Sequence, residues 1–459
     1  MISSSMHGTQ LACGTDRSRN PPLLVKCRQE VYLRSRAPGR RLRECDVENS
    51  RITCSADEEQ HMMTPKENLM AILSGQKPEW VPVSVHIANA NNLPGHLPRE
   101  LLNDPLDRLE ISRFVGGDIL HEINAVRTKP SAGMRTKSET CGDMRAATLV
   151  TPEGSLTEEV MYARVPTPVV EPLPEGHVLP WPIVNSVHTS FFIKGIPDYQ
   201  ILKSYHQSLT YEADHDLIVR EQNRVGDRGI CILGGGPSSP LYSLVARYAG
   251  IEQLSLDMFD NPDEVESAME VMTEAACRWY RAAASSPCDV IRCTEDLDTK
   301  LVSPDWFHRY AKPALTEYAR ICHEKGKKFV VHMCGHVRGL LPDIASIGAD
   351  AVHCLTSPPT GDTTIREARR VLSGHTAAML RMDAHLMLNG SAEEIDRVVA
   401  EMCNELGNWA GALIIIPCGR ASLANIRRVI SQFREPGNSR QCNAEQDACR
   451  LSHAGVQKA

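Results

Sequence analysis

Two residue types that bind soft metals stand at the end of a short apolar stretch, residues 328–335 (KFVVHMCG). The β-branched and aromatic residues of this stretch predict a buried strand, which Gly335 ends. Side chains two positions apart share one face of a strand, so His332 and Cys334 are expected to point the same way, about 7 Å apart at the backbone. An imidazole and a thiolate on one face are the beginning of a zinc site.

A third candidate ligand, Cys418, ends another apolar stretch, residues 412–419 (ALIIIPCG). One imidazole and two thiolates suit zinc and leave a fourth position for a substrate, a water molecule or a carboxylate. The alternative is that these residues only fill space, because His-x-Cys also occurs by chance and free cysteines are often buried. The chain has 16 cysteines, and most are expected to be free thiols in a reducing compartment.

These ligands can meet only if the strands that carry them belong to one sheet. Strands are predicted at residues 81–86, 117–122, 230–233, 289–293, 329–334, 351–355, 377–382 and 413–417. From residue 229 onward the strands alternate with helical patterns, which predicts parallel strands. Eight of them predict an α/β fold, a (β/α)8 TIM barrel, with an open doubly wound sheet as the alternative. The C-terminal ends of barrel strands meet at one face, where the candidate ligands fall.

Helices and a smaller elaboration complete the predicted barrel. Helical patterns occupy residues 262–285, 304–325, 339–347, 364–372 and 392–406, and residues 198–223 form one long helix or two. A capping box at Thr64 opens a first helix, and residues 141–165 predict a β-hairpin insertion. Residues 166–190, with six prolines, are predicted to form a loop. The glycines before Pro237 are predicted to form a turn rather than a phosphate loop.

Composition limits the remaining possibilities for the 459-residue chain. Residues 1–61 and 436–459 show weak apolar periodicity and are predicted to be disordered, which leaves residues 62–435 for the barrel. A net charge of −7 argues against nucleic acid as the main partner. No apolar run reaches membrane-spanning length, and the first 60 residues lack the apolar region of a signal peptide, so we expect a cytoplasmic protein.

Further polar residues fall at the predicted C-terminal ends of strands, where such barrels carry their reactive groups. They are His86, Glu122, Glu295, Asp296, His353 and Asp383. Glu295 or Asp296 could supply the fourth zinc ligand or a substrate proton, or form a salt bridge within a loop. His353 could hydrogen-bond a ligand or a substrate, or be a satisfied core histidine.

Short segments besides the ligands are typical of one superfamily. They are residues 63–68 (MTPKEN), 78–83 (PEWVPV), 151–154 (TPEG), 193–199 (IKGIPDY), 260–265 (DNPDEV), 303–307 (SPDWF) and 347–351 (IGADA). With the H-x-C…C pattern of His332, Cys334 and Cys418, they resemble the zinc-dependent, corrinoid-linked methyltransferase branch of the uroporphyrinogen decarboxylase superfamily. The resemblance extends over most of residues 63–435.

The resemblance implies a reaction and its cofactors. It implies zinc held by the three ligands. It also implies methyl transfer between a small donor, such as a methoxylated aromatic or a methanol- or methylamine-type compound, and a corrinoid. The chain has no D-x-H-x-x-G segment, so the corrinoid is expected on a separate partner protein. Asp383, in residues 381–384 (RMDA), stands where the family has G-x-D-A, which implies a supporting role. The oligomeric state is open, a homodimer being one possibility.

One departure from the superfamily bears on the reaction. The decarboxylase branch has an arginine-rich M-R-Q-A-G-R segment near its start, whereas the corresponding residues 83–89 (VSVHIAN) contain no arginine. Decarboxylation of a porphyrin-like substrate is therefore the second candidate function. A non-catalytic barrel that serves as a binding or assembly subunit is the third, and intact metal ligands argue against it.

Overall fold

The computed structural model describes residues 62–86, 101, 107–164, 183–374, 376–417 and 421–434. The chain divides into two units at the boundary between His61 and Met62. The disorder predicted for residues 1–61 and 436–459 falls outside the described residues, and so does Cys418. Everything below concerns the second unit.

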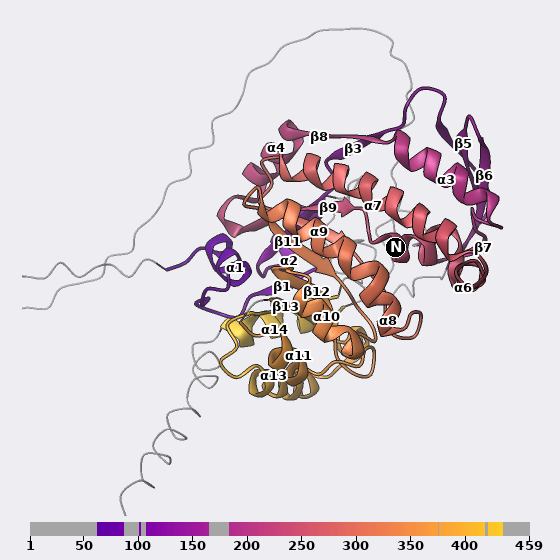
Figure 1. The fold of residues 1–459 in the computed structure, drawn as a ribbon. Coiled ribbons are helices and arrows are strands. Elements are labelled where there is room, and N and C mark those ends of the chain that lie inside the picture. Colours follow the sequence, from indigo (N-terminus) through magenta and orange to yellow (C-terminus); the bar gives the residue numbers. More distant parts are fainter. Residues whose placement is uncertain are drawn as a thin grey trace, which may run out of the picture. The chain divides into compact units, whose positions relative to one another are not determined.

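Eight strands form the central sheet, in the order β1-β14-β13-β12-β11-β10-β9-β2 (Figure 1). Their bounds are β1 Val83–Val85, β2 Ile119–Ile123, β9 Gly229–Gly236, β10 Val290–Thr294, β11 Lys328–His332, β12 Ala351–Thr356, β13 Ala377–Arg381 and β14 Ala412–Ile416. All neighbouring pairs are parallel. The two end strands also lie close together, because the N–H of Asp118 donates to the carbonyl of Val83 over 2.8 Å. The sheet is thus a nearly closed barrel, which confirms the predicted fold class.

Helices alternate with the barrel strands as predicted. They are α1 Pro65–Leu73, α2 Arg108–Val115, α3 Pro197–Ser208, α4 His215–Val225, α5 Pro240–Ser243, α6 Gly250–Asp260, α7 Pro262–Ala284, α8 Pro304–Trp306, α9 Lys312–His323, α10 Leu341–Ser346, α11 Ile365–Leu372, α12 Ala384–Asn389, α13 Ala392–Leu406 and α14 Leu423–Arg434. In the described part of the chain, no helix combines the length and the apolar character needed to cross a membrane.

Helix α1 closes the N-terminal end of the barrel. The predicted capping box is present: the Thr64 hydroxyl accepts the N–H of Glu67, and the Glu67 carboxylate accepts the N–H of Thr64. Leu69 and Ile72 of this helix share an apolar cluster with inward residues at the strand starts, such as Val290. A second, larger cluster fills the space between the strands and the surrounding helices. This closure leaves the C-terminal strand ends as the polar end of the barrel.

An antiparallel sheet is inserted between β2 and α3 (Figure 1). Its strands are β4 Arg135–Cys141, β5 Met144–Thr151, β6 Gly154–Arg164 and β7 Ile183–Ser190, and a separate pair joins β3 Val126–Lys129 to β8 Thr210–Ala213. The predicted hairpin is confirmed as β5 and β6. The loop predicted for residues 166–190 is wrong at its end, because residues 183–190 pair with β6.

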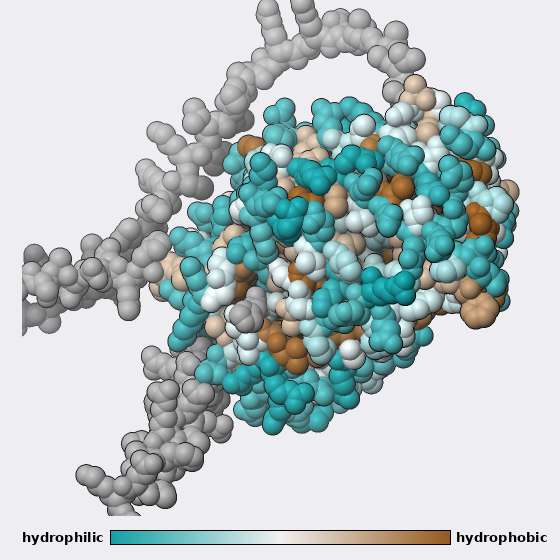
Figure 2. Space-filling model, viewed as in Figure 1, coloured by the Kyte–Doolittle hydropathy of each residue, from teal (hydrophilic) through white to brown (hydrophobic). Residues whose placement is uncertain are grey.

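The space-filling view shows a mainly hydrophilic face with separate apolar spots (Figure 2).

Two further sequence predictions fail at strand ends. Strand β11 ends at His332, so Cys334 lies in the following loop rather than on the strand. The glycines predicted as a turn belong to β9, which runs through Gly236. Glycine is needed at these positions because neighbouring side chains leave no room for a Cβ. A Cβ on Gly234 would lie 2.2 Å from Oε1 of Glu122, and one on Gly236 would lie 2.8 Å from the Tyr280 hydroxyl. No local pattern distinguishes such glycines from turn glycines.

Candidate metal centre

Three possible ligands gather at the ends of β10 and β11. The ligand atoms of Asp296, His332 and Cys334 all lie within 4.8 Å of one another. The pairing of Thr294 with His332 across the two strands sets the relative height of the loops that follow. The N–H of Glu295 then donates to the carbonyl of His332 over 3.0 Å. This backbone bond brings Asp296 beside the residues that end β11.

Asp296 bonds Cys334 and lies beside His332. Its Oδ1 accepts the Cys334 thiol over 2.9 Å and the Cys334 N–H over 3.3 Å. The same oxygen lies 3.7 Å from Nε2 of His332, which is beyond hydrogen-bonding distance. The turn after Cys334 needs glycine, because Gly335 has φ +88° and a Cβ there would lie 2.8 Å from Oδ2 of Asp298. The loop therefore folds the thiol back toward the imidazole.

The protonation states of these groups fit a cation site. Burial, followed by the Asp296 carboxylate, raises the pKa of the Cys334 thiol well above its usual range. Burial lowers the pKa of His332 to about 4, although Asp296 opposes this shift. The site thus holds a neutral imidazole, which is the form that binds metals, and a thiol whose proton a cation would displace. The adjacent carboxylate would then neutralise part of the added charge.

Glu295 is turned away from this group. Its side chain is fully buried, and its two oxygens accept the N–H and the hydroxyl of Ser239, each over 2.7 Å. Burial raises the pKa of Glu295 to about 7, against the lowering effect of these two bonds. Of the two neighbouring carboxylates, Asp296 lies at the candidate ligands, and Glu295 connects β10 to the loop before α5.

His353 lies directly opposite His332, on β12. The two Nδ1 atoms are 2.7 Å apart, and the ring of His86 stands 5.5 Å from that of His353 in an edge-to-face arrangement. The neighbouring Cys354 has φ +64°, and its thiol lies within 4.8 Å of one ring nitrogen of His332 and one of His353. Cys354 was not among the candidate ligands that the sequence indicated. Its placement follows from a register shift between β12 and β13, which no sequence pattern announces.

The sequence did not indicate a partly buried ion pair at the same end of the barrel. Nη2 of Arg292 donates to Oε1 of Glu122 over 2.6 Å, and Arg292 is only 9% exposed. Its positive charge contributes to the lowered pKa of His86, after the larger effect of burial. An arginine inside the apolar stretch 289–293 was the available signal, because a charged residue in a buried strand requires a partner.

Two sequence candidates remain, Asp383 and Cys418. Asp383 is the N-cap of α12: its carboxylate accepts the N–H of Leu386 over 2.9 Å and the hydroxyl of Thr360 over 3.0 Å. It is not in either group of possible ligands found among the described residues. Cys418 lies outside those residues.

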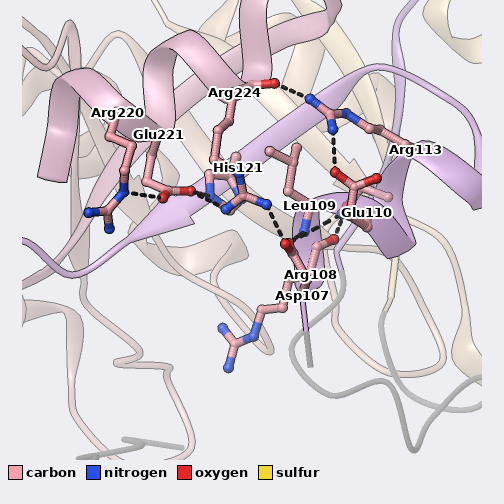
Figure 3. Close-up of polar contacts among 10 residues, drawn as sticks. Asp107, Arg108, Leu109, Glu110, Arg113, His121, Arg220, Glu221 and Arg224 are labelled. Carbon is pink, nitrogen blue, oxygen red and sulfur yellow. Dashed lines mark hydrogen bonds and ion pairs between the residues drawn. The ribbon is translucent and has the colours of Figure 1, made fainter. Parts of the chain in front are cut away.

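A surface cavity of about 940 Å³ lies at the opposite end of the barrel, before β9 begins, between α2 and the end of α4. Charged residues beside it form a continuous network (Figure 3). Arg224 binds both Glu221 and Asp107, and Nε2 of His121 lies 3.2 Å from Glu221. These contacts join α2, β2 and α4, so the network serves to hold the elements together.

Comparison with known proteins gives a family match and weaker likenesses. Residues 211–419 match the family model "Uroporphyrinogen decarboxylase (URO-D)". "Methylcobamide:CoM methyltransferase MtaA" of Methanosarcina barkeri is 25% identical over 119 residues, which are 26% of this chain. The chain spans about a third (34%) of that relative's length.

Among solved structures, a methyltransferase from Methanosarcina mazei has a TM-score of 0.47 at 14% identity, covering 81% of this chain and 98% of the other. A D-psicose 3-epimerase has a TM-score of 0.31 at 12% identity, covering 51% of this chain and 84% of the other. Both TM-scores are below 0.5. The strand order of the central sheet identifies the barrel without these two structures.

Proposed function

We propose, from the match of residues 211–419 to the URO-D family model, that this chain is a zinc-dependent methyltransferase. It would move a methyl group between a small methylated compound and a corrinoid carried by a separate protein. The observation that carries the proposal is the gathering of Asp296, His332 and Cys334 at the C-terminal strand ends. The relative from Methanosarcina barkeri, named as a methylcobamide methyltransferase, supports methyl transfer over decarboxylation.

The donor set matches what zinc binds in proteins. Imidazole, thiolate and carboxylate are its common ligands, and catalytic zinc sites keep one position for the substrate. We assign Nε2 of His332 and the thiolate of Cys334 as ligands, with Cys418 as the third protein ligand on the strength of the H-x-C…C pattern. Asp296 takes the fourth position when no substrate is bound.

Zinc at this site would act as a Lewis acid that holds a substrate thiol as a thiolate or makes a substrate oxygen a better leaving group. The protein's own groups prepare the site for this role. Asp296 accepts a hydrogen bond from the Cys334 thiol, so its carboxylate lies beside the sulfur that would bind the ion. Burial keeps His332 neutral, so the imidazole does not repel a cation.

Metal content tests the first half of the proposal. We expect the purified full-length protein to hold about one zinc ion per chain, and the His332→Ala and Cys334→Ser variants to lose it. Cys418→Ser should lose it as well. Cys141→Ser, which changes an exposed cysteine of the inserted sheet, is the matched control and should keep the ion. A folded wild-type protein that takes up no zinc from an excess would contradict the proposal.

Cobalt spectroscopy tests the second half. The zinc-loaded protein is mixed with a Co(I) corrinoid protein and a panel of methoxylated aromatics, methanol and methylamines, and in the reverse direction with a methylated corrinoid and thiols. We expect one class of compound to convert the Co(I) spectrum to that of methylcobalt, or the reverse, with no conversion by His332→Ala. Zinc binding without any spectral change would remove methyl transfer and leave only a metal-binding barrel.

A further inference from the structure

The contact between His332 and His353 is a hydrogen bond between two rings on neighbouring strands. The register of β11 and β12 places the two residues opposite each other. Their Nδ1 atoms are 2.7 Å apart, and the ring centroids are 5.0 Å apart. At this distance the two Nδ1 atoms are partners in a hydrogen bond.

A bond of this kind requires one proton between the two nitrogens. One Nδ1 must carry hydrogen and the other must present a lone pair, because two N–H groups or two lone pairs would repel at this distance. His353 is 2% exposed, so solvent would not compensate for two N–H groups or two lone pairs that face each other. Which of the two rings donates the proton depends on whether Nε2, the other nitrogen of His332, carries a hydrogen or a lone pair.

Nε2 of His332 is the atom that faces the candidate metal site. It lies 3.7 Å from Oδ1 of Asp296, too far for a hydrogen bond, and Cys334 is on the same side. A neutral imidazole has one N–H and one lone pair. If Nε2 presents its lone pair to a cation, the single proton of His332 is on Nδ1, and it is donated to Nδ1 of His353.

We propose that His353 is a positioning residue that holds His332 in the Nδ1–H tautomer and so aims the Nε2 lone pair of His332 at the metal. Metal-binding histidines commonly donate their second N–H to a carboxylate, a backbone carbonyl or water. Here an imidazole, opposite in the barrel wall, takes that place. The inference rests on the proposed metal site and adds to it the group that fixes its imidazole ligand.

The backbone around His353 supports this role. Pairing between β11 and β12 is regular up to the two histidines. Immediately afterwards Cys354 adopts φ +64°, and the register between β12 and β13 shifts. A non-glycine residue in this conformation is strained, and such strain and bulges often mark places where a side chain is redirected. The irregularity thus begins directly after the paired histidines.

The tautomer of His332 can be read directly in the metal-free protein. Two-bond proton–nitrogen NMR correlations of histidine-labelled full-length protein distinguish Nδ1–H from Nε2–H rings, and His332→Ala identifies the signals of His332. We expect the Nδ1–H form in the wild type. His353→Leu removes the acceptor, so the His332 signals should shift toward the Nε2–H form that free histidine prefers. His353→Asn places an amide oxygen near the position of Nδ1 and should restore Nδ1–H.

Zinc affinity gives an independent measurement. Loss of a ring's hydrogen-bond partner typically weakens metal binding about 10- to 100-fold. We expect this loss in His353→Leu, by chelator competition, and a smaller loss in His353→Asn. His121→Leu is the matched control: it removes another largely buried strand histidine with a carboxylate partner, Glu221, outside the metal site. Its zinc affinity should equal that of the wild type.

The outcomes separate this inference from the proposed function. A wild-type His332 with its proton on Nε2 overturns the inference, and so does a His353→Leu variant with unchanged tautomer and zinc affinity. If the wild type binds no zinc but His332 is in the Nδ1–H form and depends on His353, the proposed function fails and the hydrogen-bond assignment stands. If His353→Leu does not fold, the wild-type tautomer and the His353→Asn variant still decide the question.

Discussion

At the scale of single residues, the hydrogen-bond partner of a side chain decides whether it is available for chemistry. Glu295 and Asp296 are adjacent in sequence, but Glu295 is bonded to Ser239, and Asp296 is bonded to Cys334. Asp383, at the same end of the barrel, is occupied as a helix cap. Three carboxylates with similar sequence signals therefore have three different environments.

Substitution of Asp296 tests its assignment to the metal site. In Asp296→Asn the amide oxygen can still accept the Cys334 N–H, so the loop should fold, but the negative charge near the cation is removed. We expect zinc affinity to fall about 10-fold, measured by chelator competition. Asp383→Asn is the control, because Asn caps a helix as well as Asp, and its zinc affinity should not change. Equal affinities for Asp296→Asn and the wild type would exclude Asp296 as a ligand.

At the scale of elements, Asp350 connects β11 to β12, the two strands that carry the histidine pair. Its carboxylate accepts the N–H of Phe329 over 2.7 Å, the Lys328 ammonium over 3.1 Å and Nε2 of His323 at 2.8 Å. Burial acts to raise the pKa of Asp350, but these hydrogen bonds outweigh it, and the pKa is lowered. The ionised carboxylate is therefore the stabilising form.

This lowered pKa predicts a pH-dependent effect of Asp350→Asn. Because the folded pKa is below the unfolded value of about 3.9, the contribution of the carboxylate is complete above that pH and is lost as the pH falls through the folded pKa. We expect the variant to be less stable by about 2 kcal/mol at pH 7, with the difference shrinking below about pH 4. Urea unfolding at several pH values measures it. The exposed Asp305→Asn should show no such trend, and a pH-independent difference would contradict the assignment.

The pairing of β2 with β9 depends on a residue without a side chain. Gly229 pairs with Ile119, and a Cβ on Gly229 would lie 2.0 Å from the Ile119 carbonyl oxygen. We expect Gly229→Ala to lower the free energy of unfolding by about 3 kcal/mol, because backbone atoms would have to move. Gly195→Ala, whose nearest neighbour would be Pro197 at 3.9 Å, should change it by less than about 0.5 kcal/mol. Similar values for the two variants would contradict the close approach.

At the scale of the whole molecule, the barrel unit has its own core. Among the described residues the buried apolar clusters extend from Leu69 to Phe433, and Met1–His61 separate from Met62–Ala459 as a compact unit. We therefore expect a chain that begins at Met62 to unfold at the same temperature as the full chain and to bind the same amount of zinc. Calorimetry and metal analysis of the two proteins test this. A lower unfolding temperature of the shortened chain would show that residues 1–61 stabilise the barrel.

The sequence by itself determined the barrel and the position of its polar end. Strand and helix periodicity, the capping box at Thr64 and the hairpin of residues 141–165 are local properties, so they can be recognised without knowledge of distant contacts. The same periodicity located His332 at a strand end. Local signals failed where crowding or pairing with a distant segment decides the conformation, as in Gly234 and in strand β7.

Only the tertiary structure decided which side chains meet. In the folded chain, Asp296 rather than Glu295 lies beside Cys334. His353 lies opposite His332, and Arg292 forms an ion pair with Glu122. These contacts join residues on different strands, and they depend on strand register and on the direction in which each loop leaves its strand. A shift of one residue in register would send the side chains to the other face. A sequence pattern identifies the strand that carries a candidate ligand, and the packed barrel determines which side chains lie beside it.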